Sequence, residues 1–223
     1  MKILGIHGGA TALQNGASAA LIIDGKLIVA AEEERFVRFK EGFGHSPIRS
    51  IQACLKEAKL KINDIDLIVH AGVTHKDLSK RIELYMNHYF GFCPKIHLVD
   101  HQHAHLATAY YCSPFDEAMC VSFDGYGDEI SVALAKAKGR NIEMIERRDM
   151  YQSLGAFYKS ITSFLGFGPL EEEYKVMGLA SYGREGIELS DFLNVKDDDY
   201  SLDHTYCRRY GKSFEKSNDD PNL

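Results

Sequence analysis

Two segments carry most of the information about this chain, VDHQHAHL at residues 99–106 and VSFDG at residues 121–125, which together span Val99 to Asp124 and the following glycine. An apolar segment leads into His101 and His105, at the start of a helical run expected over 104–111. Residues four apart on a helix share a face, one turn apart. Neutral imidazoles with this spacing can ligate one metal ion. The pattern favours a metal site, while local hydrogen bonding at a helix N-terminus is the alternative.

Asp124 follows the next apolar segment and directly precedes Gly125-Tyr126-Gly127. It has two interpretations at this stage. As a turn residue it would hydrogen-bond to nearby backbone, and as a third ligand it would face His101 and His105. A mixed nitrogen and oxygen set suits iron, manganese, zinc or magnesium. Such a site keeps positions open for substrate oxygens, on which the ion acts as a Lewis acid.

Composition limits the classes of partner and compartment. The chain has 223 residues, of which 45% are hydrophobic, enough for one or two domains. A net charge of -6 gives no electrostatic reason to expect nucleic acid. Five cysteines without a C-x-x-C pair indicate a reducing compartment. The apolar run at the N-terminus is too short for a signal peptide, and no apolar segment approaches the length of a membrane span. We expect a cytoplasmic protein.

The first half of the chain predicts a mixed sheet. Asp24-Gly25 between two apolar runs is a strong hairpin signal. Later apolar segments alternate with helical ones, which indicates parallel pairing. Ser46-Pro47 would open a helix, with the serine as its N-cap. Glu32, Glu33 and Glu34 read as a solvated strand end. The expected strands cover residues 3–6, 17–23, 27–31, 66–71 and 95–99, and expected helices include 78–89.

The same order of elements then begins again. Strands expected at 118–123, 130–135 and 142–145 repeat the first three, and we infer an internal duplication. The predicted domains are a first subdomain at 1–115, an incomplete second subdomain at 116–190 and a polar insertion or tail at 191–223. If the first repeat is complete, the second is unfinished, and a later segment or a partner supplies the rest.

Glycines follow equivalent strands in both repeats, at Gly8-Gly9 and at Gly125-Tyr126-Gly127. Glycine lets backbone amides approach an anion closely, and successive N–H groups form a concave phosphate site. Either turn alone also suits a plain hairpin. Their occurrence at equivalent places predicts a nucleotide held between the two halves.

At these residues the sequence resembles the O-carbamoyltransferases of nodulation-factor and antibiotic biosynthesis. The resemblance covers about residues 1–183, in order. It is carried by Val99 to His105, Ala109-Tyr110-Tyr111, Ser113-Pro114-Phe115, Asp124 to Gly127, Tyr174 to Ala180, and Glu32 to Phe36 with Arg38 and Lys40.

The resemblance implies an α/β fold of the actin/sugar-kinase-like (ribonuclease-H-like) ATPase type, with the first repeat complete and the second truncated. In that family carbamoyl phosphate and ATP give a carbamoyl-adenylate, whose carbamoyl group passes to a hydroxyl of a small molecule. His101, His105 and Asp124 would ligate a metal, usually iron, with a further aspartate past Leu223. Lys40 would contact the carbamoyl-adenylate.

The nucleotide would be bordered by Gly125, Tyr126, Gly127, Lys175 and Gly178. Asn15-Gly16 stand where the family commonly has His-Asp, and the second catalytic domain is missing, so the chain alone should not complete the reaction. One alternative is a threonylcarbamoyl transferase acting on tRNA, which would need a basic surface. The other is a non-catalytic nucleotide- or metal-binding module. An unfinished second repeat would expose apolar sheet, which favours a homo-oligomer.

Overall fold

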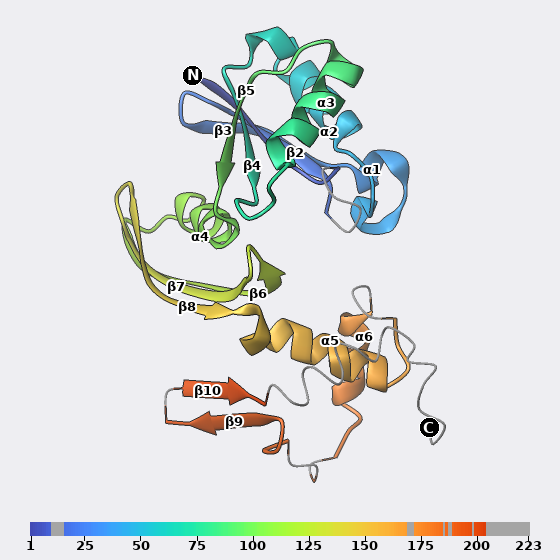
Figure 1. The fold of residues 1–223 in the computed structure, drawn as a ribbon, viewed down its shortest axis with the longest axis vertical. Helices are drawn as coiled ribbons and strands as arrows, with labels where there is room; N and C mark the ends of the chain where they lie inside the picture. Colours follow the sequence, from blue (N-terminus) through green and yellow to red (C-terminus); the bar gives the residue numbers. More distant parts are fainter. Residues whose placement is uncertain (10–15, 169–171, 185, 187–188, 198, 204–223) are drawn as a thin grey trace. The chain divides into compact units, whose positions relative to one another are not determined.

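The computed structural model describes residues 1–9, 16–168, 172–184, 186, 189–197 and 199–203 (Figure 1). The chain divides into two compact units, Met1–Ala104 and His105–Leu223, and the boundary falls inside helix α4 (His101–Tyr111). The predicted boundary at 115/116 remains a prediction. Asn15 and the tail from residue 204 onward lie outside the described residues.

The first unit contains a five-stranded sheet in the order β3-β2-β1-β4-β5. Strand β2 pairs antiparallel with β1 and, across the Asp24-Gly25 turn, with β3; strand β1 pairs parallel with β4, and β5 continues the parallel part. This confirms both the hairpin and the parallel pairing expected from the sequence. The strands are β1 (Lys2–His7), β2 (Ser18–Ile23), β3 (Lys26–Glu32), β4 (Leu67–Ala71) and β5 (Lys95–Val99).

Helices of the first unit pack on this sheet around a shared apolar core. Leu4, Leu21 and Ile68 come from its strands, and Ile51 and Ile82 from helices α2 and α3; all five are fully buried. The helical elements are α1 (Glu34–Val37), η1 (Lys40–Gly42), α2 (Ile48–Glu57), η2 (Ile62–Asp64) and α3 (Leu78–Phe90).

The expectation of a solvated strand end is wrong for Glu33, which is only 2% exposed. Its carboxylate accepts hydrogen bonds from the backbone N–H groups of Arg49 and Ser50 at 3.1 and 2.7 Å. It therefore satisfies the free amides at the start of α2, the role predicted for Ser46. Pro47 occupies the N-cap position and no side chain of the cap itself forms a bond there.

The second unit repeats the antiparallel meander in the order β6-β7-β8. Helix α4 packs on one face of this sheet through Leu106 and Tyr110, which join Cys120 and Ala135 in a second core. The remaining elements are β6 (Glu117–Gly127), β7 (Ile130–Lys138), β8 (Asn141–Asp149), η3 (Met150–Gln152), α5 (Leu154–Phe164), α6 (Glu173–Ala180), β9 (Leu193–Lys196) and β10 (Asp199–Leu202).

The glycines at 125 and 127 do not form the turn that the sequence suggested. They lie inside β6, and the turn falls on Asp128 and Glu129, whose φ angles are 51° and 67°. In the first repeat the expectation holds, because Gly8 and Gly9 have φ of 89° and 76°.

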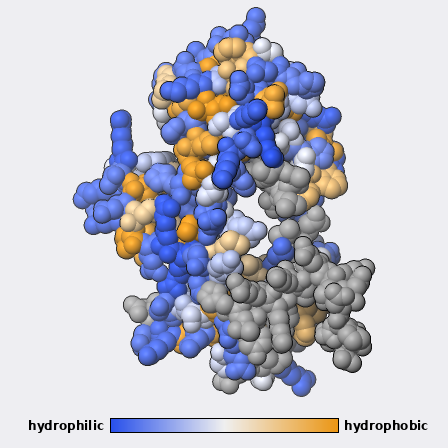
Figure 2. All heavy atoms as spheres, viewed as in Figure 1, coloured by the Kyte–Doolittle hydropathy of each residue, from blue (hydrophilic) through white to orange (hydrophobic). Residues whose placement is uncertain are grey.

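The surface carries both hydrophilic and hydrophobic side chains. Figure 2 shows hydrophobic residues in small groups between hydrophilic ones over the face that it draws. Among the described helices, none is both long and apolar enough to cross a membrane.

Candidate metal centre

Helix α4 begins at His101, three residues earlier than the sequence predicted. Asp100, the residue after β5, acts as its cap: the Asp100 carboxylate accepts the backbone N–H of His103 at 2.8 Å. The earlier start places His101 and His105 on one helical face, one turn apart. The strand, the cap and the helix together therefore place both histidines on this face.

Strand β6 supplies Asp124 to the same place. Side chains alternate along a strand, so Asp124 shares a face with Ala118, Cys120 and Ser122. Ala118 and Cys120 pack against α4, which identifies this as the face under the helix. Past Phe123 the register of β6 against β7 shifts: the residues from Asp124 to Tyr126 oppose only Ser131.

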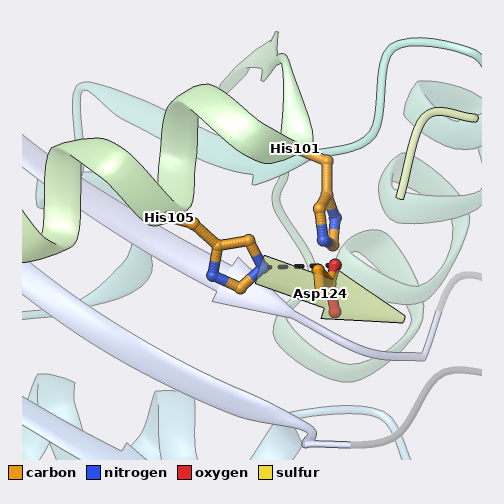
Figure 3. Close-up of side chains that lie close together, drawn as sticks. All are labelled: His101, His105 and Asp124. Carbon is orange, nitrogen blue, oxygen red and sulfur yellow. Dashed lines mark ion pairs between the residues drawn. The ribbon is translucent and has the colours of Figure 1, made fainter. Parts of the chain in front are cut away.

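The three side chains point toward one another from α4 and β6 (Figure 3). One ligand atom of each lies within 4.8 Å of the other two. Nε2 of His105 is 3.6 Å from Oδ2 of Asp124, with 53% and 28% of the two side chains exposed. The predicted convergence of His101, His105 and Asp124 is thus present in the structure.

The arrangement fits a metal ion by its donor set and its spacing. Nitrogen and oxygen ligands sit 2.0–2.2 Å from an ion, so two of them lie within about 4.4 Å of each other. The 3.6 Å separation of His105 and Asp124 already meets this limit. The other separations are at most 4.8 Å, close to the same limit. Two imidazoles and one carboxylate with open positions are typical of non-haem ferrous sites.

Helix α5 supports the backbone of Asp124, which the sequence did not reveal. Ser153 Oγ donates to the Asp124 carbonyl at 3.1 Å, and the same oxygen caps α5 by accepting the Ala156 N–H at 2.9 Å. A Cβ added at Gly155 would lie 3.0 Å from the Asp124 carbonyl oxygen. A serine before a helical run signals a cap, but nothing in the sequence links it to Asp124.

The other predicted site residues are distributed over both units. Lys40 belongs to η1 of the first unit and lines an open hollow of about 360 Å³. Gly125, Tyr126 and Gly127 continue β6 directly beyond Asp124.

Lys175 and Gly178 lie on α6, which packs against α5. Lys175 Nζ donates to the Glu172 carboxylate, and this bond raises the pKa of the lysine. Each predicted nucleotide-binding residue thus lies in a defined strand or helix, and the contact of these residues with a nucleotide stays a prediction.

Comparison with known sequences identifies a protein family that matches the segment containing this site. Residues 79–218 match the family described as "Carbamoyltransferase N-terminus". The chain is 34% identical over 197 residues to the uncharacterized protein MJ1051 of Methanocaldococcus jannaschii, covering 87% of this chain and 36% of that protein. It is 32% identical over 195 residues to nodulation protein NolNO of Sinorhizobium fredii, covering 78% and 28%. The chain spans about a third of the length of these curated relatives.

Comparison with solved structures supports the fold. Component A of the (R)-2-hydroxyglutaryl-CoA dehydratase of Acidaminococcus fermentans superposes with a TM-score of 0.53 and 14% identity, over 99% of this chain and 70% of that one. At this identity the likeness shows the fold alone. The α/β fold of the actin/sugar-kinase-like type is thereby confirmed.

Proposed function

The chain belongs to the carbamoyltransferase family, through the N-terminal part that its residues 79–218 match, and from this we propose that it carries the metal- and nucleotide-binding portion of an ATP-dependent O-carbamoyltransferase. The observation that carries the proposal is the cluster of His101, His105 and Asp124. All three lie within the matched residues. Family membership and a metal-competent geometry thus fall on the same segment.

The reaction proposed is a two-stage transfer. In the first stage water cleaves carbamoyl phosphate to carbamate and phosphate, and a carbamate oxygen then attacks the α-phosphorus of ATP, which forms a carbamoyl-adenylate and releases pyrophosphate. The hydroxyl oxygen of a small-molecule acceptor then attacks the carbamoyl carbon, forming an O-carbamoyl product and releasing AMP, while the hydroxyl proton leaves to a base. A divalent ion, iron by its donor set, supplies Lewis-acid polarisation of phosphoryl or carbonyl oxygens when bound.

Several residues of this chain have proposed roles in binding. His101, His105 and Asp124 hold the ion, and Lys40 contacts the carbamoyl-adenylate. The nucleotide is bordered by Gly125, Tyr126, Gly127, Lys175 and Gly178. Because the chain spans only about a third of its relatives, we propose that a further C-terminal part completes the reaction.

Metal titration of the chain tests the site directly. We expect one ferrous ion per chain by calorimetry under anaerobic conditions, and an affinity reduced in His105→Ala and Asp124→Asn. The reduction should exceed the roughly 10- to 100-fold that loss of an outer-shell partner costs. His103→Ala is the matched control, because it removes an imidazole from the same helix but outside the cluster. Equal losses in all three variants contradict the assignment.

Product analysis of the whole protein tests the reaction. ATP, carbamoyl phosphate and ferrous ion together should yield AMP and pyrophosphate, and omission of carbamoyl phosphate should abolish both. A whole protein that binds the ion but releases neither product would instead be a non-catalytic binding module.

A further inference from the structure

The segment that carries Lys40 has an unusual backbone. Arg38 and Glu41, on either side of Lys40, have φ of 60° and 58°. Residues other than glycine rarely adopt this left-handed conformation, because Cβ approaches the following carbonyl oxygen. Such conformations persist where the surroundings impose them, and they concentrate at functional sites. Residues 38–42 are called the Lys40 turn below.

Glu34 binds both left-handed residues of the Lys40 turn. Its backbone carbonyl accepts the Arg38 N–H at 2.9 Å. Its carboxylate oxygen Oε2 accepts the Glu41 N–H at 2.7 Å, and Oε1 lies 3.3 Å from the Arg35 guanidinium. One residue therefore clamps the backbone before and after Lys40.

Glu33 anchors this clamp to the rest of the first unit. Its buried carboxylate holds the first turn of α2 through Arg49 and Ser50, and its own N–H donates to the Ala17 carbonyl at 2.8 Å. On the far side, the Glu41 carbonyl accepts the Gly16 N–H at 2.6 Å. The Lys40 turn is therefore fastened to α2 and to the start of β2.

The clamp shapes a cationic hollow. The hollow of about 360 Å³ is lined by Glu34, Arg35, Arg38, Phe39 and Lys40, so three cations gather there in a chain of net charge -6. The one carboxylate among them is engaged with the Glu41 amide and Arg35. The Glu34 carboxylate thus holds the Lys40 turn together, while Arg35, Arg38 and Lys40 line the hollow.

We infer that Glu34 is a positioning residue, whose carboxylate sets the Lys40 turn so that Lys40 meets an acyl phosphate group. The inference rests on the proposed function, in which Lys40 contacts the carbamoyl-adenylate. Glu34 acts through the Glu41 amide and touches no reacting atom. A glutamine can still accept that N–H, whereas an alanine cannot. The two substitutions therefore separate the acceptor from its charge.

The experiment uses Glu34→Ala and Glu34→Gln, with Glu32→Ala as the control. Glu32 is two residues away, is 60% exposed and also pairs with Arg35, so its loss removes the same charge without touching the turn. Hydrogen exchange of the Glu41 amide reports on the turn itself. Acetylation of Lys40, quantified by mass spectrometry at increasing concentrations of carbamoyl phosphate, reports whether this probe protects the Lys40 amine. Circular dichroism confirms that each variant is folded.

We expect Glu34→Ala to accelerate hydrogen exchange of the Glu41 amide. The concentration of carbamoyl phosphate that halves the acetylation of Lys40 should rise on the order of tenfold or more, because a small misplacement of a positioned group greatly weakens its interaction. Glu34→Gln and Glu32→Ala should behave like the parent. Unchanged exchange in Glu34→Ala, or equal effects of Glu32→Ala, overturns the positioning role. Absence of Lys40 protection in the parent overturns the role proposed for Lys40 itself, while the exchange data still report on the clamp.

Discussion

At the scale of single residues, the local sequence pointed to the position of one carboxylate, Asp124, and missed the contacts of another, Glu33. Glu33 stands in a run of three glutamates that looks solvated, yet its partners come from the backbone of Arg49 and Ser50. Asp124 was identified because it ends an apolar run near a His-x-x-x-His pair. The difference is that helical spacing is local information, whereas the burial of Glu33 depends on where α2 docks.

Glu33→Ala should lower the free energy of unfolding by about 1–3 kcal/mol, because it leaves buried amide donors at the start of α2 without their acceptor. Urea denaturation of the chain measures this. Glu32→Ala, which changes an exposed neighbour, should stay within about 0.5 kcal/mol of the parent. Equal values for both variants would contradict the capping role.

Gly155→Ala should weaken metal binding about tenfold, since its Cβ would press on the Asp124 carbonyl at 3.0 Å and move a ligand. Calorimetric titration with ferrous ion measures the effect. Gly5→Ala is the control, because its Cβ would meet the Ala20 carbonyl at an ordinary 3.7 Å. An unchanged affinity in Gly155→Ala would mean that α5 does not set Asp124.

At the scale of elements, the expected strands and helices agree with the structure where they rest on a periodic pattern of apolar residues within one short segment of the sequence. The two meanders, the hairpin at Asp24-Gly25 and helix α3 follow from apolar periodicity and turn residues. The turn expected at Gly125 to Gly127 was wrong, because glycine also fits an irregular strand and Asp128 and Glu129 adopt the left-handed turn instead. Start points of α2 and α4 differed because distant or preceding carboxylates cap them.

The hairpin β9–β10 depends on Arg148, which donates to the Tyr200 carbonyl at 2.8 Å and pairs with Asp199. Arg148→Ala should release the hairpin and speed proteolysis within 193–202, while Arg140→Ala should not. The bond from Arg148 holds the pKa of Asp199 below its usual 3.8. A lowered pKa stabilises the fold above about pH 3.8, and this stabilisation is lost as pH falls further. Proteolysis with an acid-active protease across that range checks the direction.

At the scale of the whole molecule, the duplication was visible in sequence because each repeat carries the same strand order. The two compact units meet within α4, where Leu106 and Tyr110 pack on the second sheet, while the domain boundary at 115/116 stays a prediction. The convergence of His101, His105 and Asp124 could be predicted from spacing and family resemblance together, and their role as metal ligands stays a prediction. The support of Asp124 by Ser153 and Gly155 could not be predicted, because it joins segments far apart in the chain.

On β6, the face of the second sheet opposite α4 carries three exposed apolar side chains, Met119, Val121 and Phe123. We predict weak self-association of the chain through this face, measurable by sedimentation equilibrium. Met119→Glu should reduce it, and the new carboxylate would lie across from Lys136, which preserves the sheet. Leu84→Glu, at 63% exposure on α3, adds the same charge elsewhere and should leave association unchanged. Parallel losses would indicate a general charge effect.

The support that Ser153 gives to Asp124 comes from 29 residues further along the chain. During synthesis on the ribosome, the histidines and the aspartate therefore emerge before the segment that steadies the aspartate. If the proposed site holds an ion, a nascent chain should bind that ion more tightly once α5 has left the exit tunnel, so the gain in metal affinity would mark the completion of this part of folding.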